Sequence, residues 1–141
     1  MKELDEKLSN EINEKFDQSF EFKKRGQIEE SFFAMQEAIK LVPSPKSQWS
    51  ESLIIITYAC EHFIAIEKLA DARALIDEYL NSDFCISYDD NPSFIKGIIL
   101  FEMGDFEQAY EWFDKANSIS KGRCFVEQPK KYKTFFNEYN Q

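Results

Sequence analysis

The sequence predicts an all-α protein. Apolar residues recur every three or four positions in successive segments, and the breaks between these segments are short. Turn-forming residues are scarce, with four glycines and four prolines in 141 residues. Hydrophobic residues make up 43% of the chain and include 14 phenylalanines. A chain of this length can therefore bury a core without a metal or a disulfide.

The first predicted helix carries an apolar residue at every fourth position and ends near Gly26. Its stripe consists of Leu4, Leu8, Ile12, Phe16 and Phe20. Basic residues at 23–25, followed by glycine, are a helix stop signal. A second helix follows directly and ends at Pro43. Its stripe consists of Ile28, Phe32, Met35, Ile39 and Val42.

The third predicted helix begins at Ser44 and Pro45, which are typical of an N-cap and a first-turn proline. Its apolar residues cover more than one side, which predicts a position in the middle of a stack. They are Trp49, Leu53 to Ile56, Tyr58, Ala59, Phe63 and Ile66. The fourth helix has its stripe at Leu69, Ala72, Ile76, Tyr79 and Leu80. A loop rich in Asp and Ser follows over 81–90.

Three further helices complete the predicted chain. An Asn-Pro pair at 91–92 opens the fifth helix, and Gly104 ends it. Asp105 caps the sixth, with Gln108 three residues later as in a capping box. The seventh begins at Pro129. The stripes are Phe94, Ile98 and Phe101 in the fifth, Phe106, Ala109, Tyr110, Phe113 and Ala116 in the sixth, and Tyr132, Phe135, Phe136 and Tyr139 in the seventh.

One pattern recurs in three helix pairs. Small residues, 41 and 37 positions apart, mark the same point in the second helix of each pair: Ser31, Ala72 and Ala109. A large residue follows one turn later. Gly26 and Gly104 let the chain reverse with positive φ, whereas the middle pair has Glu67-Lys68 there. This pattern resembles the tetratricopeptide repeat. The resemblance implies a tetratricopeptide-like α-α superhelix of three helix pairs plus a C-terminal capping helix.

We expect a single helical repeat domain over residues 1–141. The repeats are predicted at about 12–43, 50–82 and 91–120, with the C-terminal helix at about 129–139. The alternative is an irregular helical bundle, in which similar amphipathic helices pack without a repeat.

The charge balance suits a basic partner, and the alternative is an acidic surface unrelated to any partner, as many soluble proteins have. There are 17 Lys and Arg residues against 26 Asp and Glu, a net charge of −9, which repels phosphate backbones. We therefore expect no direct nucleic-acid binding. The longest apolar run, 53–56, is far shorter than the roughly 20 residues that span a bilayer. With no signal-peptide core and three cysteines without C-x-x-C spacing, we expect a cytoplasmic protein with reduced thiols and no membrane contact.

The sequence predicts no enzyme, no cofactor, no metal and no small-molecule substrate. It contains no glycine-rich phosphate loop, and the acidic residues at 83, 89 and 90 lack the ligand spacing of a calcium loop. The single histidine, His62, would be the general base if the protein were a small hydrolase. We favour the alternative, a partly exposed or interface histidine.

By helical register, the first helix of each pair should line a concave groove with an apolar floor and acidic edges. The residues expected there are Phe16, Phe20, Tyr58, Glu61, Phe94, Ile98 and Glu102. Grooves of this kind hold peptides or the edges of other proteins.

Several segments carry a second resemblance. They are Leu41-Val42-Pro43-Ser44-Pro45 followed by Trp49, then Asn91 to Ile95, then Leu100 to Gly104, then Phe125 with Pro129 to Tyr132 and Phe135. Together they are similar to a group of small bacterial tetratricopeptide-type proteins associated with polymorphic toxins, including contact-dependent growth inhibition systems. Gln128 departs from the acidic residue usual in that group, and the isoleucine run replaces its small residues.

The resemblance implies an immunity protein that binds a secreted toxin domain, such as a nuclease, and blocks its active site. An acidic body would be steered toward a basic cleft, and aromatic anchors would hold it there. The partner-binding residues expected are Trp49, Tyr58, Glu61, His62, Tyr88, Asp89, Asp90, Phe94, Glu102 and Tyr132. The alternative is a small acidic helical-repeat chaperone or adaptor that binds an extended peptide of a secreted protein.

Overall fold

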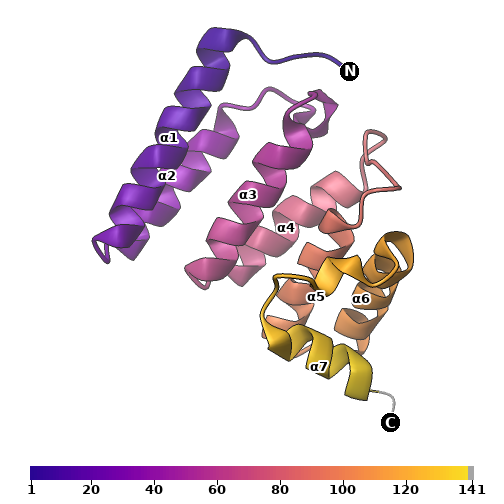
Figure 1. The fold of residues 1–141 in the computed structure, drawn as a ribbon. Coiled ribbons are helices and arrows are strands. Elements are labelled where there is room, and N and C mark those ends of the chain that lie inside the picture. The colour runs from indigo at the N-terminus through magenta and orange to yellow at the C-terminus, as the bar shows by residue number, and fades with distance from the viewer. Residues whose placement is uncertain (140–141) are drawn as a thin grey trace. The chain divides into compact units, whose positions relative to one another are not determined.

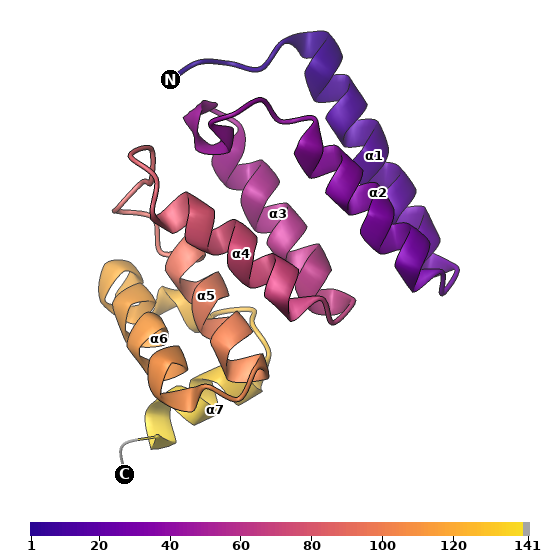
Figure 2. The same cartoon turned by 180° about the vertical axis from the view of Figure 1, so that it is seen from behind.

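The computed structural model describes residues 1–139, which form seven α-helices, two 3-10 turns and no β-strand (Figures 1 and 2). The helices are α1 (Glu6–Lys24), α2 (Ile28–Lys40), α3 (Ser52–Ala65), α4 (Leu69–Leu80), α5 (Asn91–Glu102), α6 (Phe106–Ser120) and α7 (Lys130–Glu138), and the turns are η1 (Lys46–Gln48) and η2 (Arg123–Phe125). This confirms the all-α fold class. Within the described part of the chain, no helix is long and apolar enough to cross a membrane.

The helices are distributed over two compact units. The first, Met1–Phe84, contains α1 to α4, and the second begins at Cys85 and contains α5 to α7. Helices adjacent in sequence pack as antiparallel pairs: α1 with α2, α3 with α4, and α5 with α6 (Figure 1). In the second unit, η2 and α7 cover the α5–α6 pair through the core residues Phe125 and Tyr132.

The same turn joins the helices of all three pairs. Gly26, Glu67 and Gly104 adopt left-handed φ angles of 77°, 62° and 85°. In each turn, the next residue donates its backbone N–H to a carbonyl in the last turn of the preceding helix, as in a Schellman motif. These bonds are Gln27 to Phe22 at 2.9 Å, Lys68 to Phe63 at 2.8 Å and Asp105 to Leu100 at 2.9 Å. The middle pair therefore keeps the turn although it lacks the glycine.

Small residues allow the two helices of each pair to approach closely. In α1 and α2, the Ser19 hydroxyl donates to the Ser31 carbonyl at 2.6 Å, and the Ser31 hydroxyl donates to the Ser19 carbonyl at 2.7 Å. In the second pair, the Cys60 thiol lies 3.5 Å from the Ala72 carbonyl oxygen. In the third, a Cβ atom on Gly97 would come within 2.6 Å of a ring carbon on α6. The predicted small positions are therefore sites of close helix contact.

The start of the third helix differs from the prediction. Ser44 and Pro45 do not open it, because Trp49 is extended (φ −91°, ψ 149°) and separates η1 from α3. The Ser52 hydroxyl holds this connection. It accepts a hydrogen bond from the Trp49 backbone N–H at 2.9 Å and donates to the Lys46 carbonyl at 2.6 Å. These local bonds compete with helix formation before Ser52.

The predicted first-turn proline of α5 and the predicted cap of α6 are confirmed, whereas Asn91 is the first residue of α5 and not its cap. Pro92 lies in the first turn of α5, where its missing N–H costs no helical hydrogen bond. Asp105 caps α6, since its carboxylate accepts the Gln108 backbone N–H at 3.3 Å. The Gln108 side chain donates to that carboxylate at 2.9 Å, not to the cap backbone as a full capping box requires.

Candidate functional site

A groove in the first unit lies between α1 and α3 and has a volume of about 330 Å³. We call it the α1–α3 groove. It arises because the apolar stripe of α1 packs toward α3 and leaves an open channel at the surface. The lining residues that matter for its chemistry are Ile12, Phe16, Asp17, Glu51, Ile54 and Tyr58.

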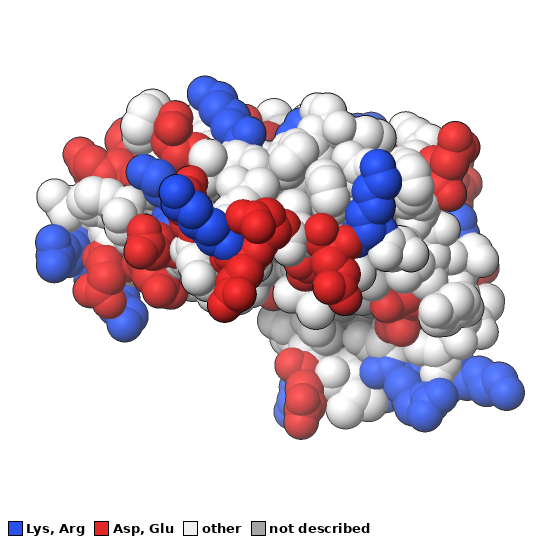
Figure 3. All heavy atoms as spheres, turned by 90° about the horizontal axis from the view of Figure 1, so that it is seen from above, with Lys and Arg blue, Asp and Glu red and all other residues white. Residues whose placement is uncertain are grey.

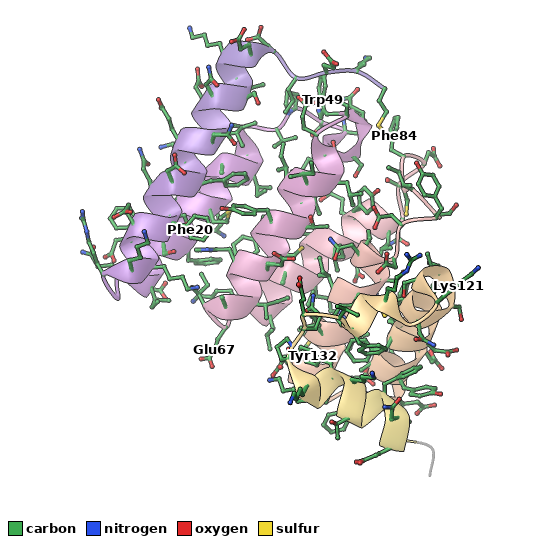
Figure 4. The ribbon with its side chains drawn as sticks, viewed as in Figure 1. Phe20, Trp49, Glu67, Phe84, Lys121 and Tyr132 are labelled. Atoms are coloured by element: carbon green, nitrogen blue, oxygen red, sulfur yellow. The ribbon has the colours of Figure 1, made fainter. Side chains whose placement is uncertain are left out.

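The floor of the α1–α3 groove is aromatic and apolar. The Tyr58 ring lies 5.2 Å from Phe16 and 5.3 Å from Phe20, measured between ring centroids. Figure 4 shows Phe20 on the side of α1 that faces α3. Ile54 is 73% exposed and Tyr58 is 38% exposed. This apolar surface is unburied and is therefore suited to contact with another molecule.

The edge of the groove is acidic. Burial raises the pKa of Glu61, and its carboxylate makes no hydrogen bond or ion pair with any residue among 1–139. Desolvation, followed by the charges of Asp17 and Glu61, raises the pKa of Tyr58. The Glu51 carboxylate has partners. A hydrogen bond from the Ser50 hydroxyl is the main cause of its lowered pKa. The negative potential around Tyr58 is therefore supplied mainly by Asp17 and Glu61.

This local acidity is not part of one continuous acidic face in the view of Figure 3. That view shows acidic and basic side chains interspersed with neutral surface. The groove is therefore distinguished by its apolar floor together with the charges of Asp17 and Glu61 near Tyr58.

His62 lies behind the aromatic floor and is not part of the accessible surface. It is only 3% exposed, which corrects the expectation of an interface or partly exposed histidine. Its Nε2 lies 2.9 Å from the Ser19 hydroxyl and 2.8 Å from the Ser31 hydroxyl. Both hydroxyls already donate to carbonyl oxygens, so Nε2 carries the proton and donates to them. Its ring packs edge-on against Phe20.

The environment of His62 keeps it neutral. Desolvation and then the positive charge of Lys23 lower the pKa of His62 to about 4. Its Nδ1 is buried and has no hydrogen-bond partner within residues 1–139. The neighbouring serine hydroxyls are engaged with backbone carbonyls, and burial raises the pKa of Cys60 to about 12. These groups act in packing the α1, α2 and α3 helices together.

Phe94 and Tyr132, expected to contact a partner, are instead core residues of the second unit. Phe94 is 2% exposed and packs on Phe113 and Phe125 at ring distances of 5.1 and 5.3 Å. The Tyr132 hydroxyl donates to Glu102 at 2.9 Å and thereby fastens α7 to α5. Their burial corrects the expectation that these rings face outward, because aromatic stripes on a capping helix pack against the pair they cover.

Glu102 is also engaged within the second unit. Besides the Tyr132 hydroxyl, the Lys131 ammonium lies 2.7 Å from the same carboxylate. Hydrogen bonds from Lys131 and Tyr132 outweigh the effect of burial and lower the pKa of Glu102. The residue is exposed, but its charge is already paired.

The remaining predicted residues lie in connecting segments. Trp49 is half-buried, and its indole N–H donates to the Pro43 carbonyl at 2.9 Å. The Asp89 carboxylate accepts a hydrogen bond from the Asn91 backbone N–H at 2.9 Å and so supports the start of α5. Asp90, directly before α5, is half-buried. Tyr88 is exposed in the loop before α5. Of the ten predicted partner-binding residues, Tyr58 lines the α1–α3 groove, and Glu61 lies about one helical turn beyond it on α3, where its charge raises the pKa of Tyr58.

Several groove residues were not among the predicted contacts, including Ile54, Asp17 and Glu51. Ile54 belongs to an apolar run that suggests burial, and only its angular position on α3 leaves it exposed. Asp17 and Glu51 carry no signal beyond acidity, although Asp17 directly follows the groove residue Phe16. Helical wheel spacing places a residue on a face, but the neighbouring helix decides whether that face is covered.

No known protein-family model matches the chain. No curated protein matches it either. Within the described residues, no group of three or more His, Cys, Asp or Glu side chains is placed to hold a metal ion.

Proposed function

We propose that this protein is a tetratricopeptide-like immunity protein that binds a secreted toxin domain, such as a nuclease, and blocks its active site. The observation that carries the proposal is the α1–α3 groove, which is lined by the exposed Ile54 and Tyr58 and by Asp17, with Glu61 about one helical turn beyond Tyr58 on α3. An apolar anchor site with an acidic edge suits a basic protein surface.

The repeat arrangement in this proposal is supported by recurring geometry. The positive-φ turns at Gly26, Glu67 and Gly104 are 41 and 37 residues apart, the same spacing as the small residues of the second helices. We propose that the three pairs stack as a tetratricopeptide-like superhelix with α7 as its cap. Figure 4 shows Glu67 at the end of its helix pair, at the turn between α3 and α4.

The proposal places this protein among binding proteins and not among enzymes. Its single histidine is buried and neutral, and the two serines beside it donate to carbonyls. A general base needs hydrogen-bond access to a substrate proton, which this geometry does not offer. The proposed setting is the cytoplasm of the cell that produces the toxin.

The test uses the product of the adjacent upstream gene, which the proposal expects to carry the toxin domain. We expect the purified chain and that domain to form a stable complex, and we expect the chain to suppress the activity of the toxin in solution and its lethality in cells. Size-exclusion chromatography, a nuclease assay and growth after coexpression measure these effects. A toxin that remains fully active in the presence of excess chain would remove the proposal.

A secretion chaperone is the second candidate, because an open groove also accepts a short segment of an unfolded chain. The two functions differ in the state of the ligand. An immunity protein binds the folded toxin domain, whereas a chaperone binds a denatured segment and releases it on folding. Titration with folded and with urea-unfolded toxin domain distinguishes them.

A further inference from the structure

We infer that the α1–α3 groove recognises an arginine next to an apolar side chain, both presented by one turn of a helix in the partner. The apolar side chain packs on Ile54, and the guanidinium group lies against Tyr58 between Asp17 and Glu61. This inference rests on the proposed binding function and adds the chemistry of the segment that is bound.

The unpaired carboxylates are the first argument. The charges of Asp17 and Glu61 both act on Tyr58 and raise its pKa, so the two carboxylates lie close to the same ring. Within the described residues neither carboxylate has a cationic partner, whereas Glu29 has Lys68 at 3.0 Å and Glu21 has Lys24 at 3.4 Å. A cation that enters the groove would compensate this charge with a charge-assisted hydrogen bond.

The aromatic floor decides between the two basic side chains. Tyr58 is supported by Phe16 and Phe20 and leaves part of its ring exposed. A planar guanidinium stacks on an aromatic ring and can still form a forked contact with carboxylates such as Asp17 and Glu61. The ammonium group of lysine is compact and strongly hydrated, so it gains less from this surface.

The spacing on α3 defines the shape of the ligand. Ile54, Tyr58 and Glu61 follow one another at intervals of four and three residues, so they lie on one face of the helix. A partner helix with leucine and arginine four residues apart presents its two side chains about 5–6 Å apart at Cβ. The leucine then meets Ile54 while the arginine reaches Tyr58 and Glu61.

The test uses peptides and the full chain. Three peptides of about 15 residues, long enough to populate a helix, carry leucine followed four positions later by arginine, lysine or glutamine. Binding is followed by NMR chemical-shift changes in the isotope-labelled protein. We expect the arginine peptide to bind about tenfold more tightly than the glutamine peptide, the lysine peptide to be intermediate, and the shifts to concentrate on α1 and α3.

Two variants make the test specific. Glu61→Gln should abolish the preference for arginine over glutamine while the leucine contact persists. Glu111→Gln removes the same charge from an exposed position on α6, and it should leave the preference unchanged. Ile54→Ser should weaken all three peptides, since Ile54 is largely exposed and its replacement spares the core.

Three results would overturn the inference. They are equal affinity for the arginine and glutamine peptides, shifts outside α1 and α3, or occupation of the groove by a second copy in the absence of peptide. The peptide titration uses no toxin, so the arginine site and the immunity function can be refuted separately. Toxin neutralisation that survives Glu61→Gln refutes only the arginine site, and correct peptide preference without neutralisation refutes only the immunity function.

Discussion

Acidification should destabilise the first unit through His62. Its pKa is about 4 in the native protein, against 6.5 for an unperturbed imidazole, because it is desolvated and lies near Lys23. The unfolded chain therefore binds more protons between pH 4 and 6.5, and the free energy of unfolding falls as pH falls through that window. Above pH 6.5 the imidazole is neutral in both states and contributes no pH dependence.

The size of the effect follows from the same two pKa values. The full difference corresponds to about 3 kcal/mol, and about 2 kcal/mol of it is lost between pH 7.5 and pH 5. Since His62 is only 3% exposed, solvent screening does not remove this contribution to the free energy of unfolding. A loss of that size is a large fraction of the stability of a small domain.

The chain contains one histidine, so the imidazole signals in an NMR titration come from His62 alone. NMR titration of its ring protons should give a native pKa near 4, and urea unfolding at several pH values gives the stability. His62→Gln keeps an N–H donor toward Ser19 and Ser31 but does not titrate. Between pH 7.5 and pH 5, the free energy of unfolding of this variant should fall by about 2 kcal/mol less than that of the unmodified protein. The carboxylates are the same in both proteins, so their contributions to the pH dependence cancel in the difference. A native pKa near 6.5, or equal pH slopes in the two proteins, would refute the reasoning.

Three further predictions concern the helix pairs, with the free energy of unfolding in urea as the readout. Glu67→Gly should stabilise the first unit by about 0.5–1 kcal/mol, because it relieves a left-handed φ of 62°. Gly104→Ala, where a Cβ atom meets nothing within 4 Å, should cost about 1 kcal/mol through φ alone. No gain from Glu67→Gly would contradict the turn assignment. Gly97→Ala should cost about 1–3 kcal/mol, since its Cβ atom would press on Phe113, and an unchanged stability would mean that the α5–α6 contact is looser than described.

Much of the fold follows from local sequence signals. Apolar spacing predicts seven helices, and glycine after basic residues predicts the end of α1 near Gly26. Asp105 and Pro92 predict the starts of α6 and α5. Those signals work because helix ends must satisfy their own backbone groups within a few residues. The third helix was placed too early, because the hydrogen bonds of Ser52 to the preceding segment are not visible in a periodic pattern.

The candidate site shows where sequence alone was insufficient. Of the residues predicted for a concave groove, Phe16 and Tyr58 line the α1–α3 groove, but Phe94 and Tyr132 are buried and Ile54 is exposed. An amphipathic stripe looks the same whether it faces the core or an open channel. The distinction depends on which neighbouring helix covers it.

By itself, the sequence determined the negative net charge, the number of helices, most of their ends and the recurring close contacts between paired helices. The helices, their ends and the contacts within a pair depend on residues that are near one another in the chain. Only the tertiary structure decided that His62 is enclosed by Ser19 and Ser31 and that Glu61 is left without a cation beside an open aromatic floor. Burial and charge pairing depend on residues distant in sequence, and the packing of α1 against α3 brings those residues together.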